Sequence, residues 1–507
     1  MKRLLCGTIA LLWATGLVSA QVVINEFAYD DTGTDDVEFV ELYNAGSTAV
    51  DISGWTLQSG DQLTGDNNAD YTIPSGTVLQ PGDYYVIGSG NVPNVDLVVG
   101  ANNLFENDNE WTVLRDANGN VVDAIAYETN KAPDLTTWVP ADVIPQLGPG
   151  VWGNYITLQV SATTDDTLLS IGRWRDGYDT NNNGNDFGHM PWTPGAANNP
   201  NVFSGSMVMN FDSLNVYDFV PNLSGSFRAP RAIDPTQGDP SYATTPNPNS
   251  IPASPQGGNA MIVWDWAGGG NMATSTAIFD GRAGYELYIY IDTALPVPGQ
   301  LESWMIGVLG TCDSFYNIPY RSLVNAGGMT GIGWYFRRAN TTTADPTEVK
   351  LRLLNAGTGG DSNPNGNNTW QNYGEIDLSG LSSGWYRLRL EVRGNRIIGV
   401  FGGTYGSLSD GTLITATATP NQYGSFYIGY REVFTDDSST NPVRIDALRL
   451  FVPIEGDVDG NGCVDDADLL ATLFAFGGTD PLADVNGDGT VDDADLLTVL
   501  FNFGTGC

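Results

Sequence analysis

The chain has 507 residues, 59 of them acidic and 21 basic, so its formal net charge is −38 at pH 7. A chain this negative repels phosphate backbones, which argues against nucleic acid as a partner. Its single histidine, His189, excludes a zinc site built from several histidines. His189 lies among turn residues, and we expect a partly exposed loop histidine there rather than a catalytic base.

Residues 1–20 have the pattern of a secretory signal peptide. Two basic residues precede an apolar stretch from Leu4 to Val18, and Ser19-Ala20 offers a cleavage site before Gln21. No later stretch has the 18 uncharged apolar residues typical of a membrane helix. We therefore expect a secreted, extracellular protein without membrane insertion, attached to a cell surface only through a partner.

Residues 21–198 contain short β-rich runs separated by turn residues, which predicts a β-sandwich. Glu26, Glu38 and Glu41 could form a carboxylate cluster, but we expect them to hydrogen-bond turns. Asp179-Thr-Asn-Asn-Asn-Gly184 begins like a calcium loop yet has Met190 at position 12, so a turn is favoured.

These residues resemble the lamin-tail domain, an immunoglobulin-like module of secreted proteins. The similarity has an insertion around 131–157, and it implies adhesion or partner binding without catalysis. The matching stretches are Ile24–Glu26, Glu38–Asn44, Gly54-Trp55, Pro81-Gly82, Leu114–Asp123 with its Asn118-Gly119 hairpin, Ile171–Arg173, Asp186-Phe187 and Thr193–Asn198.

Residues 200–453 contain many further strand-like runs, which predict a single jelly-roll β-sandwich, while residues 221–258 predict long loops. Gly384–Asn395 and Arg444–Leu450 resemble the concanavalin-A-like lectin/glucanase superfamily. The predicted strands are Met261–Trp266, Tyr285–Ile291, Trp304–Leu309, Gly331–Phe336, Val349–Leu354, Trp385–Val392, Arg396–Phe401, Ser425–Tyr430 and Val443–Phe451.

That resemblance implies sugar binding or glycoside hydrolysis. Glucanases of this fold carry Glu-x-Asp-x-x-Glu, but here Glu375 and Asp377 are followed by Gly380 in a predicted turn, so we expect no catalytic pair. Tryptophan rings stack on sugars, and Trp264, Trp266 and Trp304 are the candidate carbohydrate-binding residues. Alternating aromatics in a sandwich are more often core residues.

Residues 455–507 carry one 12-residue acidic pattern twice, 27 residues apart. Acidic or amide side chains at positions 1, 3, 5, 9 and 12, with a backbone carbonyl at position 7, match the oxygen ligands of Ca²⁺. We predict two Ca²⁺ sites, each followed by a short amphipathic helix. The ligands are Asp457, Asp459, Asn461, Cys463, Asp465 and Asp468, then Asp484, Asn486, Asp488, Thr490, Asp492 and Asp495.

Two loop–helix units without entering helices resemble a dockerin, a module that docks onto cohesin domains. In that family the pair after position 9 contacts the partner, and here it is Asp466-Ala467 and Asp493-Ala494 rather than small hydroxylated residues. The resemblance also places the module's ends together, so we expect a Cys463–Cys507 disulfide, with two free thiols as the alternative.

The predicted fold is therefore mainly β: an immunoglobulin-like sandwich, a jelly roll, and a small α-helical module. Three functions remain open. The favoured one is a secreted, non-catalytic binding or adhesion protein that its calcium-dependent dockerin anchors to a cohesin-like partner in a polysaccharide-degrading or cell-surface assembly, with carbohydrate binding by the jelly roll left open. The others are a glycoside hydrolase acting through the jelly roll and a structural surface-matrix protein.

Overall fold

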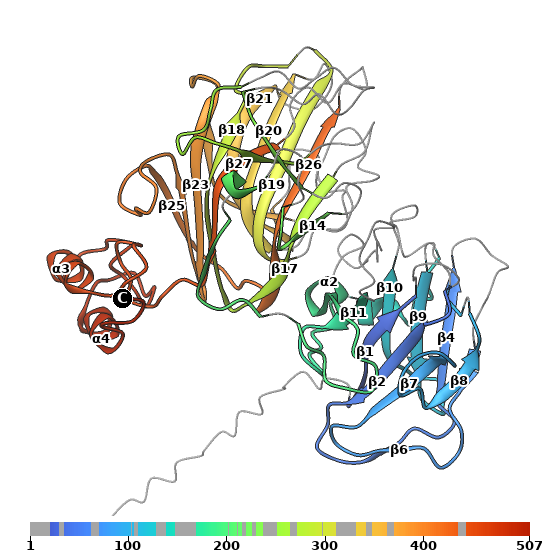
Figure 1. Cartoon of the computed structure of the whole chain (residues 1–507). Coiled ribbons are helices and arrows are strands. Elements are labelled where there is room, and N and C mark those ends of the chain that lie inside the picture. Colours follow the sequence, from blue (N-terminus) through green and yellow to red (C-terminus); the bar gives the residue numbers. More distant parts are fainter. Residues whose placement is uncertain are drawn as a thin grey trace, which may run out of the picture.

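The computed structural model describes residues 21–29, 35–61, 70–102, 104–105, 110–127, 138–147, 169–200, 202–209, 211–214, 220–225, 230–236, 251–263, 271–296, 298–310, 331–340, 347–361, 370–433 and 443–507. Within them the chain is mainly β, as predicted: two β-sandwiches precede a small loop–helix module (Figure 1). The expected signal peptide, Trp264, Trp266 and Cys312 lie outside the described residues. Among the helices of those ranges, none combines the length and apolar character needed to cross a membrane.

The N-terminal sandwich packs a sheet of order β12-β11-β1-β2-β7-β8 against a sheet of order β10-β9-β4-β5. Aliphatic and aromatic side chains, such as Ile24 and Phe27, fill the space between them. Its elements are β1 (Val22–Ala28), β2 (Phe39–Asn44), β3 (Val50–Asp51), β4 (Thr56–Asp61), β5 (Asp70–Thr72), β6 (Val78–Leu79), β7 (Tyr84–Ser89), β8 (Leu97–Gly100), β9 (Glu110–Arg115), β10 (Val121–Tyr127), α1 (Ile144–Leu147), β11 (Leu169–Arg173), α2 (Asn183–Asp186) and β12 (Phe187–Pro191).

Local signals position several of these strands. The predicted Asn118-Gly119 hairpin joins β9 to β10, and Gly119 adopts φ +83°, which glycine tolerates without strain. We expected His189 in a loop, but it lies in β12, where it pairs with Ile171. Gly188 and Pro191, which we interpreted as turn residues, therefore belong to a strand.

A buried arginine ties the two sheets together. Arg173 on β11 is fully buried, donates to the carbonyl oxygen of Ile24 (2.7 Å) and forms an ion pair with Asp123 on β10 (2.7 Å). It also lies 3.4 Å from Asp179 and 3.5 Å from Asp186. The carboxylates of Asp179 and Asp186 therefore pair with Arg173, and Asp179 also accepts from the N–H of Asn181, which agrees with the predicted turn.

The jelly roll has two facing layers. One runs β22-β21-β20-β19-β26-β17 and the other β25-β24-β23-β18-β27-β16-β15, linked by the β17–β18 hairpin. The elements are β13 (Ser206–Val208), the 3-10 helix η3 (Phe211–Ser213), β14 (Leu223–Gly225), β15 (Arg231–Ile233), β16 (Ala260–Val263), β17 (Asn271–Asp280), β18 (Arg282–Ile291), β19 (Gln300–Gly310), β20 (Gly331–Asn340), β21 (Glu348–Asp361), β22 (Trp370–Asp377), β23 (Gly384–Arg393), β24 (Arg396–Phe401), β25 (Thr412–Thr417), β26 (Tyr423–Val433) and β27 (Val443–Phe451).

The structure corrects part of the strand prediction. Strands β14 and β15 lie inside residues 221–258, which we expected to be loops. Strands β17, β22 and β25 were not predicted, because their Thr, Gly and Asn residues weaken the apolar alternation. The jelly roll also packs against the N-terminal sandwich through Trp174 and Met190 on one side and Ile278 and Tyr423 on the other.

The C-terminal module contains α3 (Asp466–Ala475) and α4 (Asp493–Phe501), each preceded by one acidic loop. Its small core includes Val458, Val464, Val491 and Val499. The module follows β27 after a short connection and lies beside β23 and β25 (Figure 1).

Candidate functional site

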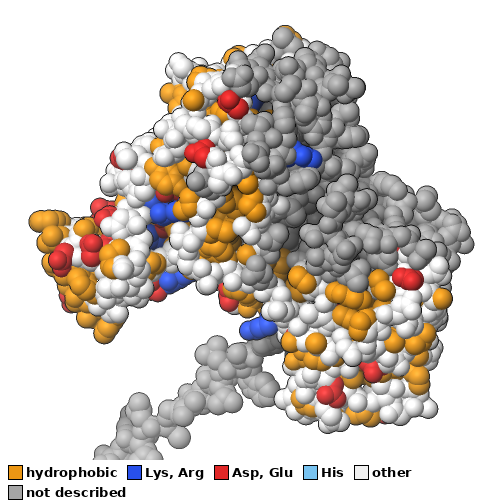
Figure 2. All heavy atoms as spheres, viewed as in Figure 1, with side chains coloured by type: hydrophobic (Ala, Val, Ile, Leu, Met, Phe, Trp, Pro, Cys, Tyr) orange, Lys and Arg blue, Asp and Glu red, His pale blue; other side chains and the backbone are white. Residues whose placement is uncertain are grey.

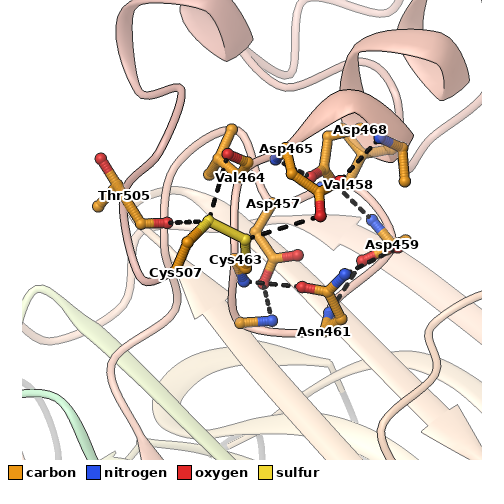
Figure 3. The surroundings of a disulfide bond; sticks show 12 residues. Asp457, Val458, Asp459, Asn461, Cys463, Val464, Asp465, Asp468, Thr505 and Cys507 are labelled. Carbon is orange, nitrogen blue, oxygen red and sulfur yellow. Dashed lines mark hydrogen bonds between the residues drawn. A yellow bond between two sulfur atoms is a disulfide. The ribbon is translucent and has the colours of Figure 1, made fainter.

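The first acidic loop brings three carboxylates together. Oxygen atoms of Asp457, Asp459 and Asp468 all lie within 4.8 Å of one another. Asp457 and Asp468 are 3% and 0% exposed, and Asp459 is partly buried. Figure 3 shows this loop, with Asn461 at its tip. The predicted residues at positions 1, 3 and 12 therefore converge.

Backbone amides hold these carboxylates in place. The N–H groups of Gly460 and Gly462 each donate to Asp457 (2.9 Å), one to each carboxylate oxygen. Asp468 accepts from the N–H groups of Asp459 (3.1 Å) and Asp465 (2.9 Å). Such amide donors stabilise the ionised form of a buried carboxylate.

The second loop repeats this arrangement. Asp484 accepts from the N–H groups of Gly487 (2.8 Å) and Gly489 (2.9 Å). Asp495 is 0% exposed and accepts from the N–H groups of Asn486 (3.0 Å) and Asp492 (2.9 Å). The sequence repeat is thus a structural repeat, at the level of individual hydrogen bonds.

The position-9 residues cap the two helices. Asp465 is the N-cap of α3 and accepts from the N–H of Ala467 (2.7 Å), and Asp492 caps α4 through Ala494 (2.8 Å). Asp465 is not among the three carboxylates that converge in loop one. Both residues therefore cap their helices, and their predicted role as calcium ligands, which position 9 often fills through a water molecule, stays a prediction.

The donor set fits a hard divalent cation. Oxygen atoms alone converge, and burial raises the pKa of Asp457 to about 6, a penalty that a bound dication would remove. The predicted sets also include Asn461 and Asp465 in loop one, Asn486, Asp488 and Asp492 in loop two, and the backbone carbonyls of Cys463 and Thr490. Ca²⁺, when bound, would neutralise carboxylates that otherwise repel one another.

The predicted disulfide is present. Cys463, at position 7 of loop one, is bonded to Cys507, 44 residues further along the chain (Figure 3). The free thiols that we considered as the alternative do not occur. This bond ties the C-terminal end of the chain to loop one, whereas Thr490, the equivalent residue of loop two, has no such restraint.

We predict that removing this disulfide destabilises the module. Closing a loop of this length contributes about 4 kcal/mol by restricting the unfolded chain. The Cys463→Ala/Cys507→Ala variant should be cleaved faster by thermolysin within residues 455–507, as monitored by mass spectrometry. Reduction should accelerate cleavage of the unmodified protein and leave the cleavage rate of the variant unchanged. Equal cleavage rates for the two proteins before reduction would contradict the prediction.

A stripe of apolar side chains is the feature that the sequence analysis missed. We predicted amphipathic helices, but eight of the leucines and phenylalanines that follow the loops range from 46% exposed at Leu500 to 87% at Phe474. Figure 2 shows them on the outer side of the module. This apolar stripe consists of Leu470, Leu473, Phe474 and Phe476 with their equivalents Leu497, Leu500, Phe501 and Phe503.

The expected partner-contact pairs are also accessible. Asp466, Ala467, Asp493 and Ala494 are exposed in the first turns of α3 and α4. They precede the apolar stripe in each repeat. The sequence did contain a clue to this stripe. The module has more apolar residues than so small a core can bury, which indicates that some of them are exposed.

The candidate sugar-binding and catalytic residues of the jelly roll lie in different environments. Trp304 is 1% exposed and stacks on Phe336 in the core, so it has no ring face free for a sugar, contrary to its candidate role. Glu375 lies at the end of β22 rather than in a turn and forms an ion pair with Lys350 (2.5 Å). Asp377 caps a turn by accepting from the N–H of Ser379 (2.9 Å).

The N-terminal glutamates are structural, as expected. Glu26 and Glu41 face each other across β1 and β2 and are fully buried. Glu26 accepts from the N–H of Thr193 (2.8 Å), and Glu41 accepts from the N–H of Gly195 (2.7 Å). Burial raises the pKa of Glu26 to about 7 and that of Glu41 to about 8.

These raised pKa values predict that the N-terminal sandwich loses stability as pH rises. The stabilising free energy of the protonated carboxyl groups is fully present below about pH 4.5. It falls as pH rises and is lost once pH passes the folded-state pKa values of about 7 and 8. Each pKa unit between the unfolded and folded states corresponds to about 1.4 kcal/mol of stability. Calorimetry of the full chain should show one transition falling in temperature over this interval. Glu41→Gln should flatten the decline, and an unchanged pH profile in that variant would contradict the prediction.

The fold defines a protein of two β-sandwiches followed by a repeated loop–helix module. A family model described as Lamin Tail Domain matches residues 18–129, which supports the predicted resemblance over β1 to β10. No curated protein matches the chain.

Several solved structures are similar to the chain at low identity. The VIP36 exoplasmic/lumenal domain, in its Ca²⁺/Man3GlcNAc-bound form, is 13% identical, with 38% of this chain and 79% of that chain covered and a TM-score of 0.26. The Emp47p carbohydrate recognition domain is 10% identical, with 49% and 95% covered and a TM-score of 0.30. Lectin II from Ulex europaeus is 12% identical, with 49% and 99% covered and a TM-score of 0.27.

Proposed function

We propose that this is a secreted, non-catalytic binding protein that attaches to a partner protein through its C-terminal module. The apolar stripe is the observation that carries this proposal. Soluble monomers rarely expose large contiguous apolar patches, and those that do usually have an interaction site there. The stripe repeats on α3 and α4, whose N-termini are both fixed by capping boxes.

The module is a dockerin-type calcium module, and its partner is a cohesin-type domain in a cell-surface or polysaccharide-degrading assembly. Buried carboxylates at positions 1 and 12 of both loops support Ca²⁺ as the bound ion. The exposed Asp466-Ala467 and Asp493-Ala494 pairs, next to the stripe, contribute to partner choice.

Capture by a panel of recombinant cohesin domains tests this proposal. The immobilised full chain should retain one or more of them in millimolar Ca²⁺ and release them in EGTA. Calorimetry should count two Ca²⁺ per chain. Calcium binding without retention of any cohesin would overturn the partner assignment, and an absence of calcium binding would overturn the module assignment.

A second proposed activity is polysaccharide binding by the jelly roll. Its support is the two-layer architecture together with the sequence resemblance to lectins and glucanases, and Trp264 and Trp266 remain its candidate stacking residues. Affinity electrophoresis against plant and bacterial polysaccharides should show retardation of the full chain. Release of reducing sugars that Glu375→Ala or Asp377→Ala abolishes would instead favour the glycoside hydrolase alternative.

A further inference from the structure

Strand β23 has charged side chains that are buried although they point away from the sandwich core. Leu388, Leu390 and Val392 face the core of the jelly roll. The residues that alternate with them are at most 9% exposed. Buried charges are costly unless they are paired, so this outer face needs a cover. The charged residues are Arg387, Arg389, Glu391 and Arg393.

The two acidic loops provide part of that cover. Arg389, which is 0% exposed, donates through Nη2 to the carbonyl oxygen of Gly460 in loop one (2.6 Å). Arg396 on β24 donates to the carbonyl oxygens of Val485 in loop two (2.8 Å) and Pro481 just before it (2.6 Å). One arginine of the jelly roll thus holds each repeat. None of these carbonyls is at position 7, so the arginines do not compete with a metal ion for the same atom.

Apolar contacts complete the junction. Leu482, between the two repeats, packs with Ile398, Val400 and Leu413 of the jelly roll and with Leu408 in its β24–β25 connection. The backbone joins as well, because the N–H of Leu408 donates to the carbonyl oxygen of Asp459 (3.1 Å).

The loops lie directly against the jelly roll. A Cβ added to Gly460 would be 2.5 Å from Leu408 Cγ and 2.7 Å from Arg389 Nη2. A Cβ on Gly487, the equivalent position of loop two, would be 2.9 Å from Cδ of Arg396. Figure 2 shows basic side chains at this junction and apolar side chains on the opposite side of the module.

The geometry points to a calcium-dependent clamp between the jelly roll and the C-terminal module, which fixes the apolar stripe facing away from the sandwiches. Arg389 and Arg396 bind loop carbonyls whose positions depend on the loop backbone. The carboxylates of Asp457, Asp468, Asp484 and Asp495 organise that backbone, and without a cation they repel one another. Loss of Ca²⁺ therefore moves the carbonyls and releases the module. This inference rests on the calcium binding proposed above.

Small-angle scattering and thermolysin digestion of the full chain test the clamp, with Ca²⁺ alone as the added ligand. The Arg396→Ala/Leu408→Asp variant breaks the junction from the jelly-roll side and leaves every predicted calcium ligand intact. Leu295→Asp is the matched control, since Leu295 is a jelly-roll residue that is 53% exposed. Calcium binding of each protein is counted by calorimetry.

In Ca²⁺, the unmodified chain and the control should be compact and resist cleavage at residues 452–456. EGTA should increase the maximum dimension and raise the cleavage rate at least tenfold. The double variant should show both changes in Ca²⁺ while it still binds two ions. A double variant as compact as the unmodified chain, or an unmodified chain that binds Ca²⁺ and stays compact in EGTA, would overturn the clamp but not the proposed function. An absence of calcium binding would overturn both.

Discussion

Chelation of calcium is expected to unfold residues 455–507 and to leave both sandwiches folded. This segment has twelve acidic residues and no lysine or arginine, and its core is small. Such a segment cannot offset its own charge repulsion, so metal binding and folding become one process. Hydrogen exchange of the full chain, followed by mass spectrometry, should show α3 and α4 losing protection in EGTA while β18 and β23 keep theirs.

The position-12 carboxylates should dominate this effect. Asp468 and Asp495 are completely buried, and each accepts backbone N–H groups from both ends of its loop. Asp468→Asn and Asp495→Asn should each remove one bound Ca²⁺ per chain. Asp466→Asn is the matched control, because it removes an equal charge from the exposed neighbouring position of the same helix. Full protection of α3 and α4 in EGTA would refute coupled folding.

Replacement of Phe474 and Phe501 together by aspartate is expected to weaken capture of the cohesin partner at least 100-fold. These rings are 87% and 84% exposed, the highest values in the apolar stripe. Aromatic side chains at the centre of an interface commonly contribute 2 kcal/mol or more each, and about 1.4 kcal/mol corresponds to a tenfold change in affinity. Surface plasmon resonance in Ca²⁺ would measure the loss.

The single substitutions separate two modes of docking. If the equivalent repeats bind either way round, Phe474→Asp and Phe501→Asp should weaken capture equally; if one repeat dominates, one substitution should account for most of the loss. Val208→Asp, at a jelly-roll residue that is 64% exposed, is the control for surface charge. Undiminished capture by the double variant, with two Ca²⁺ still bound, would show that the stripe is not the docking surface.

Local patterns predicted most of the fold and the centre of the candidate site. Fixed Asp, Asn and Gly positions predicted both acidic loops, and the structure brings Asp457, Asp459 and Asp468 together. The Cys463–Cys507 disulfide also formed as expected. One residue type can have two roles here: Asp465 matches a ligand position and is also the N-cap of α3, so its part in calcium binding stays a prediction.

Some predictions failed because periodicity distinguishes the two faces of a strand without saying what covers each one. Trp304 alternates as a surface aromatic could, yet its face packs into the core against Phe336. The alternating charges of β23 likewise do not show that its outer face is covered, yet the C-terminal module contacts Arg389 there. Contacts between residues so distant in the chain leave no local trace in the sequence.

The sequence by itself determined which parts this protein has: two β-sandwiches and a duplicated acidic module, because turn residues, strand alternation and loop spacing act over short distances. Only the tertiary structure decided which surfaces remain free. The module's core is too small to bury both helices, and arginines of the jelly roll hold its loops, so the apolar stripe faces outward. Burial depends on what packs against a surface, and that partner came from a distant part of the chain.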